Sequence, residues 1–275
     1  MVKRFPILPV VLLLPIIIAG VFGSRFYPHD PTAMNPAFAL RPPAWLPGGN
    51  SAYLLGTDQM GRDLLSRLIE GAHASLWVAV IGVALAGSIG ISLGMFAGYF
   101  GGNFDHVVMR IVDIEMSIPG ILLMILLSSV LGAGMTTIIV SIAVSFWTGY
   151  ARVIRGETLS LKQRDFVVMA KVTGCSKWRI LSKHILPSLV STILVLATLQ
   201  VGTAIMVEAA LTFLGLGLQP PATAWGQIIS DGRIYMSTAW WIPTFPGLAI
   251  MLTVLGSNLL GDWLRDTFDP KLRQV

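Results

Sequence analysis

Five long stretches of the chain contain no Asp, Glu, Lys or Arg, and they limit its possible folds more than any other feature. They run from Phe5 to Ser24, Ala74 to Phe104, Met116 to Ala151, His184 to Val207 and Ile234 to Gly261. A helix crosses a bilayer core of about 30 Å with about 20 apolar residues, whereas a helix on a soluble protein shows polar side chains every few residues. Because 54% of all residues are hydrophobic and only 12% are charged, the pattern predicts an all-α polytopic membrane protein.

These stretches divide into about six transmembrane helices. The first covers about Phe5–Val21, and we expect it to remain uncleaved because prolines interrupt it and no A-x-A site follows. The second covers about Ser75–Tyr99. The stretch from Met116 to Ala151 is too long for one span, so it predicts a hairpin of spans three and four with a tight turn at Gly132-Ala133-Gly134. The fifth span begins after Pro187, and the sixth runs from near Pro243 to Gly261.

Two details of the spans are also predicted. Span three starts near Val107 and keeps three charged residues, Arg110, Asp113 and Glu115, at its wet end. In span two, small residues recur mostly four or eight positions apart, which lets helix backbones approach closely. The glycines concerned are Gly82, Gly90, Gly94 and Gly98.

Residues 24–71 form a polar stretch with six prolines, and we expect this stretch to lie outside the bilayer because its backbone would be unsatisfied in lipid. With six spans and the N-terminus inside, 14 of the 19 Lys and Arg residues fall on the inner side. Basic residues are retained on the cytoplasmic side, so both termini are predicted to be cytoplasmic. The inner residues are Lys3, Arg4, Arg110, Arg152, Arg155, Lys162, Arg164, Lys171, Lys177, Arg179, Lys183, Arg265, Lys271 and Arg273.

The chain therefore divides into four predicted regions. Residues 1–24 are the cytoplasmic N-terminus and first span, and residues 25–72 are an extracytoplasmic loop with an interfacial helix. Residues 73–264 are the transmembrane core with an inner loop at 157–184, and residues 265–275 are a cytoplasmic tail. The net charge of +5 follows from this topology, which argues against nucleic-acid binding.

The inner loop between spans four and five predicts two short helices. Gly174 ends the first helix, and Ser176 caps a second helix that opens with Lys177. Leu159, Phe166, Met169 and Ala170 have the spacing of one helical face. Such a protrusion either lies on the inner leaflet, held by Lys and Arg, or docks a cytoplasmic partner.

The segment Met169-Ala170-x3-Gly174-x9-His184-Ile185-Leu186-Pro187 resembles the EAA loop of permeases of ATP-binding-cassette (ABC) importers. Val168 replaces the family Glu and Met169 replaces its first Ala, so an acidic contact at that position is not expected. The resemblance implies that this loop couples the chain to separate ATPases. The coupling residues it implies are Asp165, Phe166, Val168, Met169, Ala170, Lys171, Gly174, Ser176 and Trp178.

Three further segments are similar to the dipeptide, oligopeptide and nickel permeases, and to the C-type subunit of the pair. Residues 56–67 match a GTDxxGRDxxSR signature. Residues 213–226 contain Phe-Leu-Gly-Leu-Gly-Leu-Gln-Pro-Pro and Trp-Gly. The third segment runs from Asn258-Leu-Leu-Gly-Asp262 through Arg265-Asp266 to Asp269-Pro270. The signature residues are Gly56, Thr57, Asp58, Gly61, Arg62, Asp63 and Arg67. The resemblance covers about Leu55 to Arg273 and implies the permease fold of type I ABC importers.

The same residues have structural interpretations. Thr57 or Asp58 caps a short helix, and Asp63 pairs with Arg67 four residues later. Gly215, Gly217 and the two prolines that follow end span five. Glu208 lies near the outer part of that span, where an ionisable group is costly; it is either a paired structural carboxylate or a residue of the pathway or its gate. Glu208→Leu is predicted to lower transport more than protein level.

A P-loop would read G-x-x-x-x-G-K-[ST], and the chain contains no Gly-Lys dipeptide. We therefore expect no cofactor and no ATPase site on this chain. The resemblance supplies the partners: two ATP-binding-cassette subunits that bind ATP and Mg, a second (B-type) permease subunit, and an extracytoplasmic binding protein that docks on residues 24–71 or 215–241. It also implies a prokaryotic inner membrane and leaves the substrate open among dipeptides, oligopeptides, glutathione-like peptides and metal chelates.

Two other classes are disfavoured by the sequence. An ion-driven secondary transporter would show an internal repeat and several ionisable residues within its spans. A membrane-embedded enzyme would show clustered His, Asp or Glu at membrane depth. The four histidines, at 29, 73, 106 and 184, have no metal-ligand spacing, so no metal site is expected.

Overall fold

The computed structural model describes residues 6–268, and the regular secondary structure in that range is helical. The main helices are α1 (Ile7–Phe22), α2 (Leu64–Phe100), α3 (Gly102–Met116), α4 (Gly120–Leu131), α5 (Met135–Leu161), α6 (Asp165–Val172), α7 (Lys177–Ile180), α8 (Leu186–Phe213), α9 (Trp225–Gly232) and α10 (Trp241–Phe268). A π-helical turn, Leu181–Ile185, joins α7 to α8. Lys3, Arg4, Asp269, Pro270, Lys271 and Arg273, which the sequence analysis used, lie outside the described residues.

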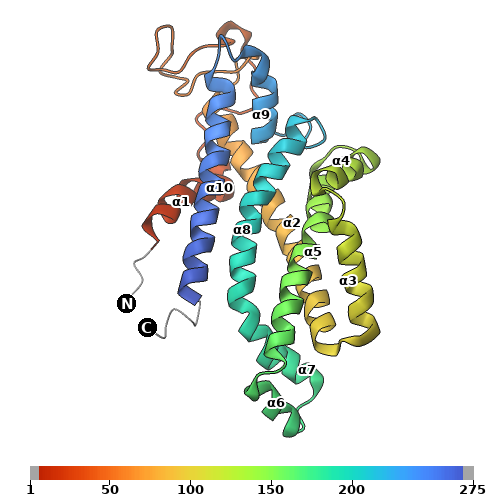
Figure 1. Cartoon of the computed structure of the whole chain (residues 1–275). Helices are drawn as coiled ribbons and strands as arrows, with labels where there is room; N and C mark the ends of the chain where they lie inside the picture. The colour runs from red at the N-terminus through yellow and green to blue at the C-terminus, as the bar shows by residue number, and fades with distance from the viewer. Residues whose placement is uncertain (1–5, 269–275) are drawn as a thin grey trace.

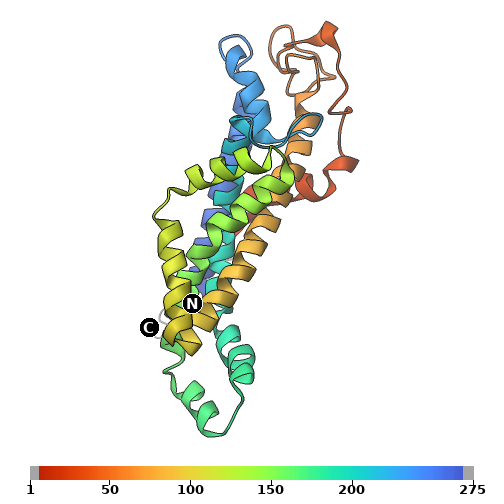
Figure 2. The same cartoon turned by 90° about the vertical axis from the view of Figure 1, so that its right-hand side faces the viewer.

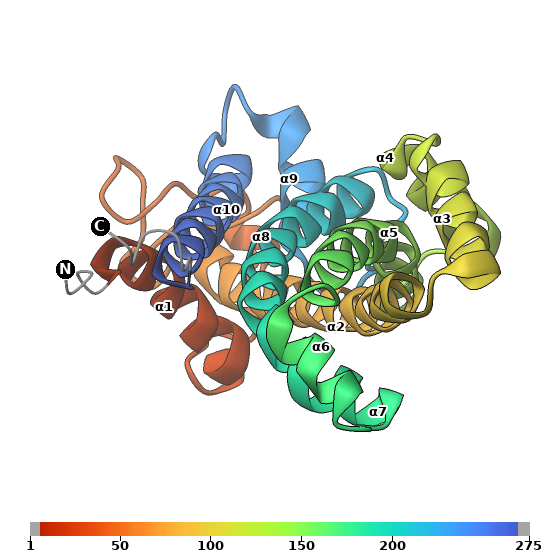
Figure 3. The ribbon, with the colours of Figure 1, turned by 60° about the horizontal axis from the view of Figure 1, so that its bottom comes forward.

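Three long helices, α2, α5 and α8, form the centre of the bundle, with α1 and α10 on one side and α3 and α4 on the other (Figure 3). The long loop after α1 and helix α9 gather at one end, which we term the cap end (Figure 1). The short helices α6 and α7 project from the opposite end, which we term the hairpin end (Figures 1 and 2). The polar loop and the basic loop thus lie at opposite ends of the bundle.

Within residues 6–268, five helices are long and apolar enough to cross a membrane, and α3 with α4 makes a sixth if the bent pair counts as one span. Their lipid-accessible surface is apolar, with Ile7, Leu8, Leu122 and Leu126 each more than half exposed. Such a surface is stable in hydrocarbon and not in water. The prediction of an all-α protein with about six spans is confirmed.

The glycines of α2 let that helix pack directly against α5. A Cβ atom on Gly90 would lie 2.3 Å from the carbonyl oxygen of Trp147, and one on Gly94 would lie 2.5 Å from that of Ala151. Both distances are too short for any side chain, so the two backbones touch as predicted for small residues four apart. This contact fixes α5, which carries α6 at its end.

The third span differs from the single helix that the sequence predicted. It begins at Gly102, ends at Met116, and continues as α4 only after a bend of 88° (Figure 2). Pro119 lacks an N–H group and disfavours helical geometry at Ile118, so the helix breaks there. The tight turn at Gly132–Gly134 is confirmed, since α4 ends at Leu131 and α5 begins at Met135.

The boundary predicted between residues 72 and 73 is also corrected. Helix α2 runs without a break from Leu64 to Phe100, so the expected interfacial helix is the first part of a 37-residue helix. Gly71 does not interrupt this helix. It packs against the Trp225 ring, which a Cβ atom at position 71 would approach to 2.7 Å. The loop after α1 is therefore joined directly to a continuous helix that crosses the bundle.

Candidate functional site

The two short helices at the hairpin end have the predicted helix–turn–helix shape. Gly174 has φ of +78°, the left-handed conformation that ends a helix, and Thr173 is the C-terminal cap residue of α6. Ser176 then caps α7, since its hydroxyl oxygen accepts a hydrogen bond from the Arg179 N–H at 3.4 Å. We term residues 165–180 the hairpin.

The base of the hairpin is firmly packed on the bundle. Val167 and Ala170 on α6 are buried together with Ile180 and Leu181, and the cluster includes Ile154 of α5. Because the contacts join α5, α6, α7 and the start of α8, the hairpin has no free hinge at its base. It is positioned to move together with α5 and α8.

The outer side of the hairpin carries an exposed apolar surface, and its aromatic rings are held from behind, Trp178 by Phe96 of α2 and Phe166 by His184. Met169 is 60% exposed and Val172 is 75% exposed. The hairpin patch consists of Phe166, Val168, Met169, Val172 and Trp178. Contiguous exposed apolar side chains of this kind mark an interaction surface.

The face predicted for this loop is wrong in one respect. Leu159 lies in α5, and the chain turns at Gln163 and Arg164 before α6 begins, so the helical spacing does not continue across the turn. Ala170 is buried, whereas Phe166 and Met169 are exposed on the outer side. The residues predicted to share one helical face are therefore divided: Ala170 belongs to the buried base of the hairpin, and Phe166 and Met169 belong to the hairpin patch.

A cavity of about 300 Å³ with a mixed polar and apolar lining lies between α3, α4, α5 and α8, halfway along the latter two helices, and is partly open to the surface. Four polar side chains line it: Glu115, Ser145, Thr148 and Gln200. Polar groups at membrane depth are costly unless they face protein or a water-filled path. We term this space the central cavity.

Glu115 is placed differently from the prediction. It was expected at the wet end of its span, but α3 begins at Gly102, which puts Glu115 at the bend at the other end of α3. One carboxylate oxygen, Oε2, accepts a hydrogen bond of 2.7 Å from the indole N–H of Trp147. The expected charged neighbours form ion pairs instead, Asp113 with Arg152 and Asp105 with Arg155.

Glu208 is packed between α8 and α2. Its side chain is 0% exposed, and its two carboxylate oxygens accept hydrogen bonds from Ser75 at 2.7 Å and Thr212 at 2.8 Å. Each oxygen thus has one hydroxyl donor, and Glu208 does not line the central cavity. This geometry fits the structural alternative, while a part in gating stays a prediction.

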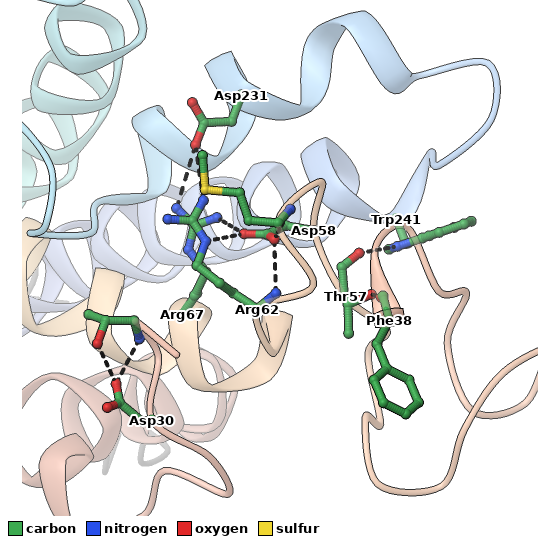
Figure 4. A network of polar contacts seen from close by, with 10 residues as sticks. Asp30, Phe38, Thr57, Asp58, Arg62, Arg67, Asp231 and Trp241 are labelled. Carbon is green, nitrogen blue, oxygen red and sulfur yellow. Dashed lines mark hydrogen bonds and ion pairs between the residues drawn. The ribbon is translucent and has the colours of Figure 1, made fainter. Parts of the chain in front are cut away.

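The GTDxxGRDxxSR segment builds an ion-pair network at the cap end (Figure 4). The Asp58 carboxylate accepts hydrogen bonds from the side chain of Arg62 at 2.6 Å and from the guanidinium of Arg67. Asp231 of α9 lies 3.5 Å from the Arg67 guanidinium and 3.8 Å from that of Arg62. We term the long loop between α1 and α2 the cap loop. The network joins this loop to the start of α2 and to α9.

Two roles predicted for this segment are wrong. Asp63, and neither Thr57 nor Asp58, is the N-cap of α2: its carboxylate accepts a hydrogen bond of 2.9 Å from the backbone N–H of Ser66. Arg67 consequently pairs with Asp58 and not with Asp63. An N-cap carboxylate points back over the first turn, which turns it away from a side chain four residues on.

Thr57 and two tryptophans complete the attachment of the cap. The Trp241 indole N–H donates to the carbonyl of Thr57 at 3.1 Å, and the Trp225 indole N–H donates to the carbonyl of Leu68 at 2.9 Å. Nearer α1, the hydrogen bonds from Thr32 hold the pKa of the exposed Asp30 carboxyl below its usual value. The cap is therefore a fixed platform over the ends of α2, α9 and α10.

Sequence reasoning located the hairpin and the cap network but missed the central cavity. The signal that identifies Glu115 is a carboxylate placed four residues before a proline, Pro119, that ends a helix within a span. Gln200 and Ser145 carry no such signal, since a single polar residue in a span is common. Within residues 6–268, no three His, Cys, Asp or Glu side chains come close enough together to hold a metal ion.

Residues 90–274 match the model of the family described as "binding-protein-dependent transport system inner membrane component". This match includes α5, the hairpin, α8 and α10.

Curated relatives match over most of the chain. The di/tripeptide transport system permease protein DppC of Pseudomonas aeruginosa is 39% identical over 96% of this chain and 87% of its own length. The dipeptide transport system permease protein DppC of Haemophilus influenzae is 40% identical over 99% and 92%. The glutathione transport system permease protein GsiD of Pectobacterium atrosepticum is 44% identical over 82% and 75%.

Among solved structures, a chain of the MetNI methionine ABC transporter in an inward-facing conformation superimposes with a TM-score of 0.61. The match covers 74% of this chain and 97% of that chain at 20% identity. The predicted permease fold of ABC importers is thus confirmed.

Proposed function

This chain belongs to the family of inner membrane components of binding-protein-dependent transport systems, and on that premise we propose that it is one of two permease subunits of an ATP-driven peptide importer. Its spans form half of the translocation pathway in a prokaryotic inner membrane. The hairpin couples those spans to ATPase subunits, and both chain termini are cytoplasmic.

The hairpin patch is the observation that carries this proposal. Met169, Val172 and Trp178 are each at least 60% exposed, although their helices are packed firmly at the base. A rigid protrusion with an apolar tip fits a groove on a partner. The basic residues of the same loop support a cytosolic location for this end of the bundle, where partner ATPase subunits would bind ATP and Mg.

The coupling mechanism follows from how the hairpin is attached. Its base is continuous with α5 and α8, and the backbone of α5 touches that of α2. When ATP draws two ATPases together, each hairpin moves with its ATPase and turns the attached helices as a rigid body. The bundle alternates between two states, and nucleotide biases their populations.

Peptides are the substrate class best supported. The relatives reported above are named for di- and tripeptides, dipeptides and glutathione, which is itself a peptide. The central cavity offers a carboxylate, hydroxyls and an amide, which match a peptide better than an apolar solute. Transport of a nickel or other metal chelate by the same architecture is the second candidate.

The remaining partners complete the transporter. A second, B-type permease subunit completes the pathway, because six spans enclose too small a bundle for a peptide path. An extracytoplasmic binding protein docks on the cap, where the ion-pair network fixes residues 56–67 against α9. This chain has no Gly-Lys dipeptide, so hydrolysis takes place on the partners.

Reconstitution tests the proposal. The chain is co-expressed with a B-type permease, the ATPases and a binding protein from the same organism, and uptake of a labelled dipeptide into proteoliposomes is measured. We expect uptake that requires ATP and binding protein and stops when this chain is omitted. Uptake of a nickel chelate but not of any peptide would support the second candidate, and uptake driven by an ion gradient without ATP would contradict both.

A further inference from the structure

Glu115 has one carboxylate oxygen with a well-aligned hydrogen bond and one without. Its Oε2 is held by the Trp147 indole and the Thr148 hydroxyl lies beside the carboxylate, whereas its Oε1 is covered by protein and receives no well-aligned hydrogen bond from the described residues. No Lys, Arg or His within residues 6–268 lies within 4 Å of this carboxylate. A covered, unpaired carboxylate oxygen at membrane depth is unfavourable and is relieved by a cationic hydrogen-bond donor.

The surroundings of Glu115 favour a cation over any other ligand. Glu115 is in the last turn of α3, and the carbonyl groups at a helix C-terminus attract positive charge. The hydroxyls of Ser145 and Thr148 and the amide of Gln200 line the same cavity and carry no positive charge. The Ser145 hydroxyl likewise has no partner within the described residues.

The cavity has room for a peptide terminus. Gly149 lines it, and a Cβ atom there would lie 3.6 Å from the amide nitrogen of Gln200, so the glycine keeps the wall beside Gln200 clear. A volume of about 300 Å³ is at the lower end of ligand sites and fits an amino group and the first peptide unit.

We propose that Glu115 binds the protonated amino terminus of a peptide in transit, with Ser145 and Gln200 contacting its first peptide unit. This inference rests on the proposed function. An ammonium group donates three hydrogen bonds, of which one satisfies Oε1. Because the contacts are to the charged terminus and the backbone, the site accepts different side chains.

A structural role for Glu115 has a different consequence. If the carboxylate only holds the Trp147 ring, its loss affects all substrates equally. If it binds the terminus, its loss affects peptides with a free amino group and spares N-acetylated peptides, which have no positive charge there. The preference for free over acetylated peptide therefore separates the two roles.

The experiment uses the complete transporter in proteoliposomes, with binding protein saturated separately with Ala-Ala or N-acetyl-Ala-Ala. Wild type, Glu115→Gln and Trp147→Phe are compared. The quantity compared is the uptake rate of the free peptide divided by that of the acetylated peptide. We expect Glu115→Gln to reduce this ratio at least tenfold, which is a typical effect of losing a desolvated charge pair. Trp147→Phe keeps the carboxylate and should lower both rates by the same factor.

Each outcome decides the question. An unchanged ratio in Glu115→Gln, or an equal fall for both peptides, overturns the proposal while leaving the peptide transport function intact. Failure of the wild type to transport either peptide overturns the proposed function itself. Glu115→Asp, which retains the charge, should keep a ratio above that of Glu115→Gln, and this comparison stays informative if Glu115→Gln is poorly folded.

Discussion

The guanidinium of Arg67 and the carboxylate of Asp58 form an ion pair that is almost completely withdrawn from solvent, with side chains 1% and 0% exposed. Arg67 belongs to the second turn of α2, whereas Asp58 belongs to the cap loop. The pair therefore fixes the loop on the end of a 37-residue helix that crosses the bundle. It gives the GTDxxGRDxxSR segment a structural role that needs no direct contact with substrate.

Asp58→Asn is predicted to destabilise the protein strongly. Removal of one partner leaves a buried Arg67 with only the more distant Asp231, and such losses cost about 3 kcal/mol or more. Thermal unfolding in detergent, followed by tryptophan fluorescence, measures the change. The double variant Asp58→Asn, Arg67→Met should be more stable than Asp58→Asn alone, and a double variant that is less stable would contradict a buried pair.

Gly174→Ala is predicted to impair coupling without impairing insertion. No atom lies within 4 Å of the new methyl group, so the cost arises from the left-handed backbone conformation alone, about 1–2 kcal/mol. We expect ATP hydrolysis to continue while peptide uptake falls. Gly156→Ala is the matched control, since that glycine also has open space around it but lies within α5 in helical geometry. Equal uptake by the two variants would show that the turn is not needed for coupling.

Charge on the hairpin patch is predicted to release the ATPase subunits. Met169→Asp and Val172→Asp place carboxylates at exposed apolar positions, so a dry contact there becomes costly. We expect the ATPases to be lost from the purified complex while the permease level is unchanged. Gln163→Asp adds the same charge at an exposed position before α6 and should retain them. Retention of the ATPases by all three variants would place the contact elsewhere.

Substitutions of Glu208 separate a structural role from one in the pathway. Because Ser75 and Thr212 each donate a hydrogen bond to it, Glu208→Leu should lower the free energy of unfolding by about 2 kcal/mol. Glu208→Gln keeps one acceptor oxygen and should retain more of the stability. The earlier expectation was a larger loss of transport than of protein level. Comparison of uptake with protein level in both variants tests it, and full stability with abolished uptake would favour the gate.

The sequence was sufficient for the approximate number of spans and for the hairpin because both depend on local features. Charge-free stretches predict the helices, and Gly174 and Ser176 define the turn between α6 and α7. A close helix contact at Gly90 and Gly94 was predicted for the same reason, since small residues four apart lie on one helix face, but the partner helix α5 was not.

The sequence was insufficient where residues distant in the chain determine the geometry. The partner of Arg67 is Asp58 because the cap loop folds back over α2, which no spacing between neighbours indicates. Asp231, 164 positions after Arg67, completes the network from α9. The central cavity depends on the 88° bend between α3 and α4, because residues on both sides of the bend line it together with Gln200 of α8.

Labelling of Cys175 tests the central claim, that the hairpin projects into the cytosol and holds the ATPases there. Cys175 is the only cysteine in the chain and follows Gly174 in the turn. A membrane-impermeant maleimide should label it in inside-out vesicles, and bound ATPase subunits should protect it. A Cys175→Ser, Ser51→Cys variant, with its thiol in the exposed cap loop, should be labelled only in right-side-out vesicles. Labelling of Cys175 in right-side-out vesicles would contradict the account.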